Sequence, residues 1–132
     1  MMQEQLAQQQ SFNEWESKWK FAKPFIERAV KRQDLYSIDD IECRIRDGVF
    51  LLWVGKRSAM VTECIEFPQM KTMNLLFCGG NYQELESMMP SIVAFAKACG
   101  IKRLHGGGRL GWLRKIPKEL GFKSEYVISK DI

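Results

Sequence analysis

At 132 residues, the chain has the length of one domain that can bury a core without disulfides or metal ions. Its 45% hydrophobic and 11% aromatic content exclude a disordered or fibrous protein. The net charge of +4 is unevenly distributed, because residues 97–132 hold nine of the 20 basic and three of the 16 acidic side chains. A basic end favours an anionic ligand such as a nucleotide, a cofactor phosphate or nucleic acid, but a solvated basic end is the commoner explanation.

The four cysteines form no CxxC pair, so we expect small buried hydrophobic residues in a reducing compartment rather than zinc ligands, and no metal. No apolar run approaches the roughly 20 residues that span a bilayer. We therefore expect a soluble protein that acts inside a cell or in a particle assembled there, without a membrane partner. The cysteines are Cys43, Cys64, Cys78 and Cys99.

Residues 1–10 form a glutamine-rich leader with little to bury, which predicts a flexible tail before a single domain over residues 11–132. Apolar residues then recur at helical spacing over Ser11–Gln33. Pro24 lies inside that pattern, so we expect a two-part helix that is broken nearby.

The next stretch predicts a short helix and then three strands. Ser37 and Asp40 have the spacing of a capping box at the start of a helix over Ile38–Arg46. Beyond Gly48 the apolar period changes to two, and short turns separate the apolar runs, which indicates an antiparallel meander. The expected strands are Val49–Val54, Ser58–Phe67 and Lys71–Cys78.

The third strand leads through Gly79-Gly80 into the central helix. Asn81 and Glu84 have capping-box spacing at its start, and Pro90 predicts a kink or a restart. A further strand over Ile101–His105 would complete a strand-helix-strand unit with a right-handed connection. The expected apolar stripe of the helix is Leu85, Met88, Met89, Ile92, Val93, Ala96 and Cys99.

The C-terminal part predicts a helix over Arg109–Leu120 and a last strand over Phe122–Ile128. The complete order of elements predicts an α/β fold in which a mixed, mainly antiparallel twisted sheet carries helices on both faces.

This order of elements, with a strand-glycine-helix unit at its centre, resembles the GNAT superfamily of N-acyltransferases over about residues 11–130. In local sequence the chain is similar to the small GNAT-like proteins of tailed phages and prophages. The matching segments are a leading Trp-containing helix, Ile38-Asp39-Asp40-Ile41, Val61-Thr62-Glu63, Gly108-Arg109-Leu110-Gly111-Trp112 and Leu120-Gly121-Phe122.

The resemblance implies that acetyl-CoA or another acyl-CoA binds where the central strand meets its helix. Two glycines before a helix N-terminus offer backbone amides to a phosphate, although a tight turn also requires them. The turn is shorter than the family pattern and lacks its preceding Arg or Gln. The residues at this place are Phe77, Cys78, Gly79, Gly80, Asn81 and Tyr82.

The resemblance also places the catalytic groups. Pro117 stands where the family usually has a tyrosine general acid, and it can donate no proton. Glu63 is the candidate catalytic base on a strand, and its alternative interpretation is a solvent-facing carboxylate. His105 is the single histidine, which would act as a base near neutral pH or have a structural role.

Gly106, Gly108 and Gly111 fit the G-x-G-x-x-G pattern of dinucleotide sites, but the chain ends too soon afterwards to complete such a fold. Arg109, Arg114 and Lys115 would suit phosphates, although a solvated helix face is the commoner explanation.

Three functions remain open at this stage. The leading one is acyl-CoA-dependent transfer of an acyl group to an amine of a small molecule or a protein. The alternative is a non-catalytic phage accessory or virion protein of the host cytoplasm or the virion, which binds phage or host proteins through Trp15, Trp19 and the tail. The third is nucleic-acid binding without sequence preference.

Overall fold

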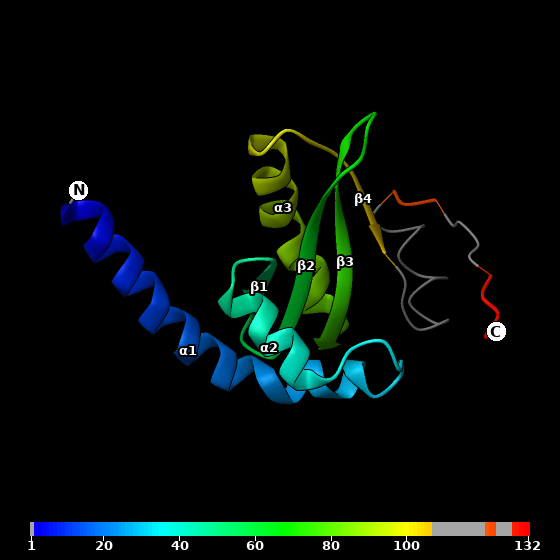
Figure 1. The fold of residues 1–132 in the computed structure, drawn as a ribbon, viewed down its shortest axis with the longest axis horizontal. Helices are drawn as coiled ribbons and strands as arrows, with labels where there is room; N and C mark the ends of the chain where they lie inside the picture. Colours follow the sequence, from blue (N-terminus) through cyan, green and yellow to red (C-terminus); the bar gives the residue numbers. More distant parts are fainter. Residues whose placement is uncertain (1, 107–120, 124–127) are drawn as a thin grey trace.

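The computed structural model describes residues 2–106, 121–123 and 128–132, with side chains from Trp15 onward. Within these residues, two leading helices are followed by a run of strands, a further helix and a last strand (Figure 1). The elements are α1 (Met2–Val30), α2 (Ile38–Arg46), β1 (Phe50–Val54), β2 (Ser58–Glu66), β3 (Lys71–Gly80), α3 (Tyr82–Ala98) and β4 (Ile101–Gly106).

The strands form one mixed sheet in the order β1-β2-β3-β4. β1 pairs with β2 and β2 with β3 in antiparallel fashion, whereas β3 and β4 are parallel and joined by α3. The predicted meander and the predicted strand-helix-strand unit are therefore confirmed. Gly79 and Gly80 continue β3 instead of ending it, because both pair with β2.

Helices cover both faces of the sheet, as the sequence predicts: α1 and α2 lie on one face and α3 on the other (Figure 1). Alternate strand residues therefore enter two separate clusters. The buried cluster under α1 and α2 contains Trp19, Ala22, Ile26, Val30, Ile41, Ile45, Phe50, Ala59, Val61 and Phe77. The buried cluster under α3 contains Met60, Met73, Leu85, Met89, Ile92, Ala96 and Ile101.

α1 differs from its prediction at its start and at Pro24. It begins at Met2 rather than Ser11, and it runs as one helix through Pro24. The helix bends, and its N-terminal part projects away from the sheet (Figure 1). Ala22 and Ile26 are fully buried on either side of the proline, so packing on the sheet holds the helix together where one backbone hydrogen bond is lost.

α3 likewise continues through Pro90, where the sequence predicts a kink or a restart. Met89 and Ile92 are buried on either side of the proline, while Pro90 itself is exposed. The apolar stripe therefore holds both halves of the helix against the sheet.

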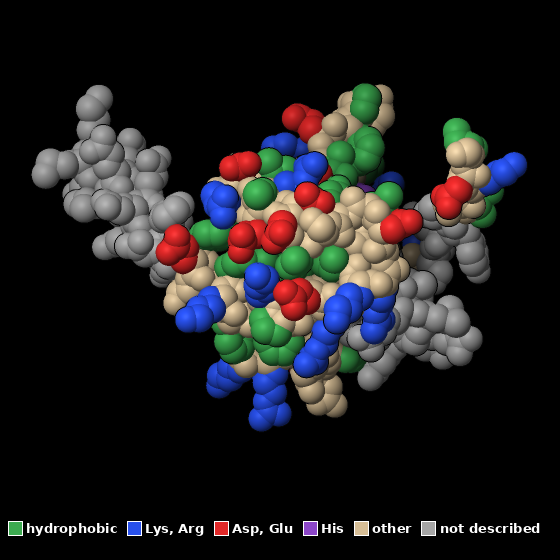
Figure 2. Space-filling model, turned by 60° about the horizontal axis from the view of Figure 1, so that its bottom comes forward, with side chains coloured by type: hydrophobic (Ala, Val, Ile, Leu, Met, Phe, Trp, Pro, Cys, Tyr) green, Lys and Arg blue, Asp and Glu red, His purple; other side chains and the backbone are tan. Residues whose placement is uncertain are grey.

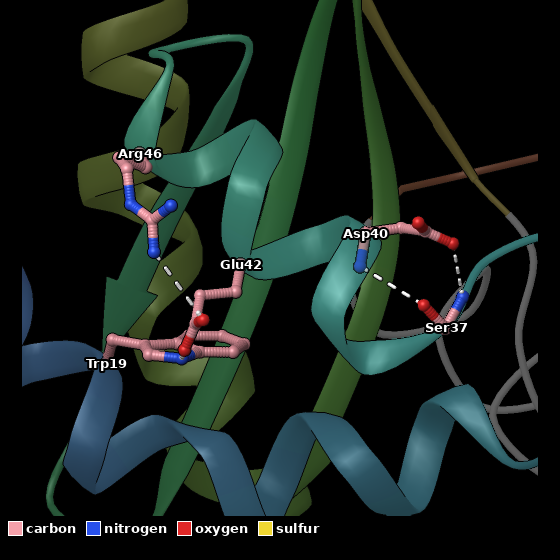
Figure 3. A network of polar contacts seen from close by, with 5 residues as sticks. All are labelled: Trp19, Ser37, Asp40, Glu42 and Arg46. Atoms are coloured by element: carbon pink, nitrogen blue, oxygen red, sulfur yellow. Dashed lines mark hydrogen bonds and ion pairs between the residues drawn. The ribbon is translucent and has the colours of Figure 1, made fainter.

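α2 is fixed by polar contacts at two places (Figure 3). The predicted capping box at its start is confirmed: Asp40 N–H donates to Ser37 Oγ (3.1 Å), and Ser37 N–H donates to Asp40 Oδ2 (2.8 Å). The bond from the Ser37 backbone holds the pKa of Asp40 below its usual value. Toward α1, the buried Trp19 indole donates from Nε1 to Glu42, which also pairs with Arg46 at 3.6 Å.

The expectation that the cysteines are buried is wrong for three of them. Cys43, Cys64 and Cys99 are exposed, and only Cys78 is partly buried. Cys43 lies on α2 between the buried Ile41 and Ile45, hence on its outer side. The spacing of the apolar residues on α2 predicts an exposed Cys43, although cysteine generally prefers the interior.

The helix expected over residues 109–120 lies outside the described residues. So does most of the strand expected over residues 122–128, of which Phe122, Lys123 and Ile128 are described without strand pairing. In the described part of the chain, no helix is long and apolar enough to cross a membrane.

Candidate functional site

The turn between β3 and α3 is fastened to the turn between β1 and β2. Asn81 caps α3, because its side chain accepts a hydrogen bond from Glu84 N–H (3.0 Å). The second half of the predicted capping box is absent here: the Glu84 carboxylate accepts from Arg57 N–H (2.7 Å) instead. Asn81 N–H donates to the buried Ser58 Oγ (2.9 Å). The amides of Asn81 and Glu84 thus already have acceptors within the protein.

Close packing explains both glycines of this turn. A Cβ at Gly79 would overlap the Phe25 carbonyl oxygen of α1. A Cβ at Gly80 would overlap the Arg57 carbonyl oxygen, and Gly80 has a φ of +114°. The glycines are needed for the fold, whether or not the turn also binds a phosphate.

Of the predicted cofactor residues, Phe77 and Cys78 turn their side chains toward the interior. Phe77 is buried under α1 and α2, where its ring meets that of Tyr36 edge-on at 6.0 Å. Cys78 packs into the cluster under α3, and burial raises the pKa of its thiol to about 12. Tyr82 is half-buried at the start of α3. A ligand at this turn would therefore meet mainly backbone and the first helical turn.

An irregularity in β3 lies next to the last described pair between β3 and β4. Val61 pairs with Phe77 and Thr62 with Leu75, so Leu76 is an extra residue with no partner on β2. Such a bulge bends its strand and increases the local twist. The last described pair between β3 and β4 is Leu75 with Gly106, and β3 runs on to Gly80 beside the start of α3. The edge of β3 from Leu76 onward thus faces a break in the described sheet.

Polar side chains form a row across the sheet next to this break. The register pairs Glu63 with Asn74 and Asn74 with His105. Their neighbours Thr62, Met73 and Leu104 lie on the α3 side, so the row lies on the face that carries α1 and α2. All three side chains are half-buried. The predicted base Glu63 and the single histidine are therefore on one face, separated by Asn74.

His105 is held by a neighbour on this face. Its Nε2 lies 2.9 Å from the Oγ1 of Thr72, which is only 3% exposed. Thr72 precedes Asn74 by two residues on β3, so both point to the same face. The imidazole is thereby fixed at the end of β4.

A surface groove of about 590 Å³ runs along the first half of α3. It begins at Gln83 in the first turn of the helix, where the helix dipole favours anions. Acidic Glu86 and Glu84 lie nearby, and Lys56 and Arg57 stand in the adjacent turn. The groove is lined by Gln83, Glu86, Ser87, Met89, Pro90, Val93 and Phe122.

The fit to a coenzyme A pyrophosphate is partial. Gln83, the start of α3 and the apolar wall at Met89 and Val93 suit a phosphate followed by an organic arm. Against this, Glu84 places a negative charge in the same helical turn, and hydrogen bonding to the Arg57 backbone holds the pKa of Glu84 below its usual value.

Several predicted features fall outside the described residues: Pro117, Arg109, Arg114 and the loop from residue 107 to 111. On the face drawn in Figure 2, basic and acidic side chains are interspersed among apolar ones. Among the residues that the structure describes, no three His, Cys, Asp or Glu side chains come together as a set of metal ligands.

Sequence reasoning missed Thr72, Asn74 and Ser58 as parts of the site. Alternation along β3 would have put Thr72 and Asn74 on one face. Their alignment with Glu63 and His105 depends on strand register, which the sequence pattern did not reveal.

The described fold is similar to solved acetyltransferases. A probable acetyltransferase has a TM-score of 0.64 at 12% identity, covering 89% of this chain and 91% of its own. A Trypanosoma brucei acetyltransferase has a TM-score of 0.61 at 9% identity, with 83% and 89% covered. The Thermus thermophilus protein TTHA1254 gives 0.56 at 14% identity, with 81% and 87% covered.

At these identities the likeness establishes the fold and nothing finer. No protein-family model matches the chain, and no curated protein matches it. The mixed α/β fold implied by the resemblance to N-acyltransferases is thus confirmed by structure alone.

Proposed function

We propose that the protein is an acyl-CoA-dependent N-acyltransferase that transfers an acyl group to an amine. The observation that carries this proposal is the bulge at Leu76 of β3, next to the last described pair between β3 and β4, in a fold shared with acetyltransferases. A thioester bound along the α3 groove would reach this bulge from one face of the sheet. The amine would approach from the other face, where Glu63 can attract its ammonium form.

When bound, acyl-CoA supplies an activated carbonyl that an amine can attack directly. The residues of this chain would orient the two reactants and handle the proton of the amine. Backbone amides of β3 at the bulge would face the carbonyl oxygen and stabilise negative charge on it.

Thermal unfolding with acetyl-CoA tests the binding step. A ligand at about a hundred times its dissociation constant adds about 2.7 kcal/mol to the stability of a protein. We expect Gln83→Glu to weaken this stabilisation, because it adds a second negative charge where the pyrophosphate would lie, while an acid in the first turn does not harm the helix. Gln69→Glu, in the turn at the opposite end of β3, is the matched control.

Release of free thiol from acetyl-CoA, measured against a panel of small amines and amine-bearing peptides, tests the transfer step. No change in melting at millimolar acetyl-CoA would contradict the proposal. Equal stabilisation of the Gln83→Glu variant would instead place the cofactor elsewhere.

The second candidate is a non-catalytic binding protein with this fold, including the phage accessory or virion role. It is favoured by the negative charge of Glu84, which would repel a pyrophosphate. It is also favoured by the backbone amides of Asn81 and Glu84, which already donate to acceptors within the protein. Trp19 is buried and would not serve as its contact residue. Binding of acetyl-CoA without turnover on the whole amine panel would favour this candidate.

A further inference from the structure

β1 is the first strand of the described sheet, and among the described residues no strand lies beside its outer edge. Gly55 N–H donates to the Ser58 carbonyl (2.9 Å), so these residues form a hydrogen-bonded pair that closes the hairpin between β1 and β2. Such pairs alternate along an antiparallel ladder, so the backbone groups of Phe50, Leu52 and Val54 point outward from the sheet. In the described part of the chain, no backbone group bonds to them there.

Solvent reaches β1 from this edge rather than from either face. α1 and α2 cover one face of the sheet and α3 the other, and alternate residues of β1 pack into the two clusters. The residues Leu51–Val54 nevertheless all remain half-buried. Beside them, Val49 is 48% exposed, and Phe95 of α3 is 38% exposed although its ring meets that of Trp53 at 5.4 Å. Apolar side chains therefore follow the open edge on both sides.

β1 has none of the features that protect an edge strand from pairing with another chain. Its five residues include no charged side chain and no proline, and its pairing with β2 has no bulge. By contrast, β4 at the other end of the described sheet carries Lys102 and Arg103. An apolar edge without such protection offers its backbone groups to a further strand.

We propose that β1 forms the contact of a symmetric dimer, in which it pairs in antiparallel fashion with β1 of a second copy of this chain. A two-fold axis at Leu52 places every outward-pointing residue opposite another one, because Leu52 meets its own copy and Phe50 meets Val54. Each of these pairs can exchange two hydrogen bonds between the copies. The inference does not depend on the proposed N-acyl transfer.

The two ends of β1 favour a second copy as the partner. In this register the hairpin turn of one copy, with the exposed Lys56 and Arg57, lies beside the end of α2 in the other copy, where Asp47 is exposed. Arg46, its neighbour, is already paired with Glu42 at 3.6 Å. The strand between these ends is uncharged, so no like charges face each other across the axis. Symmetry repeats the attraction at both ends of the contact.

Sedimentation velocity of the full-length protein over a range of concentrations tests this dimer. We expect a reversible equilibrium between monomer and dimer in the parent. Leu52→Pro should weaken the dimer by on the order of tenfold or more, because proline removes one outward N–H from each copy. A proline is tolerated in an edge strand at a position whose N–H faces outward, so the monomer should still fold. Melting curves check this.

A charge at Val49 supplies a second test that leaves the backbone of β1 intact, and it decides the matter if Leu52→Pro does not fold. In the proposed register Val49 lies opposite Gly55 of the other copy, next to Lys56. Val49→Lys should therefore weaken the dimer by roughly tenfold, whereas Val49→Glu should weaken it less. Leu35→Lys is the matched control, since it adds the same charge to an exposed residue in the loop between α1 and α2.

Amide hydrogen exchange locates the contact on the strand. In the dimer the amides of Leu52 and Val54 should be protected, and dilution to the monomer should remove that protection. The amides of Leu51 and Trp53 point toward β2 and should stay protected at every concentration.

The outcomes are distinct. A parent that stays monomeric at millimolar concentration overturns the proposal and leaves the edge to an extended peptide of another protein. Open-ended oligomers overturn the two-fold contact. A dimer that Leu52→Pro and Val49→Lys both leave unchanged overturns the assignment to β1. A dimer that both variants weaken, with concentration-dependent protection of Leu52, supports it.

Discussion

The Glu84 carboxylate of α3 accepts a hydrogen bond of 2.7 Å from the backbone amide of Arg57, in the turn between β1 and β2. This contact joins residues 27 positions apart and fastens the start of α3 to the end of a hairpin. It also places a carboxylate in the turn where the proposed acyl-CoA would carry its pyrophosphate. The side chain that stabilises the fold would thus repel a phosphate at this turn.

Glu84→Gln is expected to lower the melting temperature by a few degrees at neutral pH. The Arg57 backbone bond holds the pKa of Glu84 below the 4.5 of a free glutamate, so the folded state favours the charged form. Its stabilising contribution is therefore complete above about pH 4.5 and is lost as the pH falls through the lower folded value. Melting curves of parent and variant should converge in acid, with Glu86→Gln as the control on the same helix.

Gly79→Ala is expected to destabilise the protein by about 3 kcal/mol, because the added Cβ meets the backbone of Phe25 and overpacks a core. Gly48→Ala is the comparison: it has a φ of +77° but open space, so only the backbone cost of about 1–2 kcal/mol applies. Equilibrium unfolding in urea measures both. Equal losses in the two variants would mean that α1 shifts easily away from β3.

Two thiols should react readily with a disulfide reagent in the folded protein, Cys64 should react more slowly because burial raises the pKa of its thiol, and Cys78 should react only after unfolding. Cys43, Cys64 and Cys99 are exposed, whereas burial raises the pKa of the Cys78 thiol to about 12, so almost none of it is thiolate at neutral pH. Counting released chromophore before and after denaturation checks this. Four fast thiols in the native state would show that α3 opens.

Local signals predicted the fold well. The capping residues Ser37 and Asn81 were found from spacing alone, since each bonds within three residues. The break predicted at Pro24 and the restart predicted at Pro90 are wrong, because burial on both sides of each proline compensates for the lost hydrogen bonds. Propensity describes an isolated segment, whereas a packed helix also has the sheet to hold it.

The candidate site was less accessible to sequence reasoning. Glu63 and His105 are each recognisable as candidates, but nothing in the sequence aligned them, because they are joined only through the register of β2, β3 and β4. The extra residue Leu76 is equally a property of pairing, and its apolar character marks no irregularity. The relative positions of the site residues therefore depend on strand register, and strand register is set by contacts between strands that are far apart in the chain.

Removal of residues 1–10 should change the melting temperature by no more than a few degrees. The N-terminal part of α1 projects from the sheet (Figure 1), and among the side chains described from Trp15 onward Trp19 is the first residue of the buried core. Trp19→Ala is the contrasting variant, with an expected loss of about 3–5 kcal/mol for a buried aromatic residue. A truncated chain that melts as low as Trp19→Ala would show that the leader is docked.

Glu63→Gln should lower kcat/KM for the amine roughly ten- to hundredfold, the worth of one charge-assisted hydrogen bond. The change keeps the shape of the side chain but removes the charge that attracts an ammonium group, so KM for acetyl-CoA should not move. The loss should be greatest at mildly acidic pH, where free amine is scarcest. Glu66→Gln is the matched control, since it removes a carboxylate from the same strand on the opposite face. If both variants retain the turnover of the parent across the pH range, Glu63 has no part in the reaction.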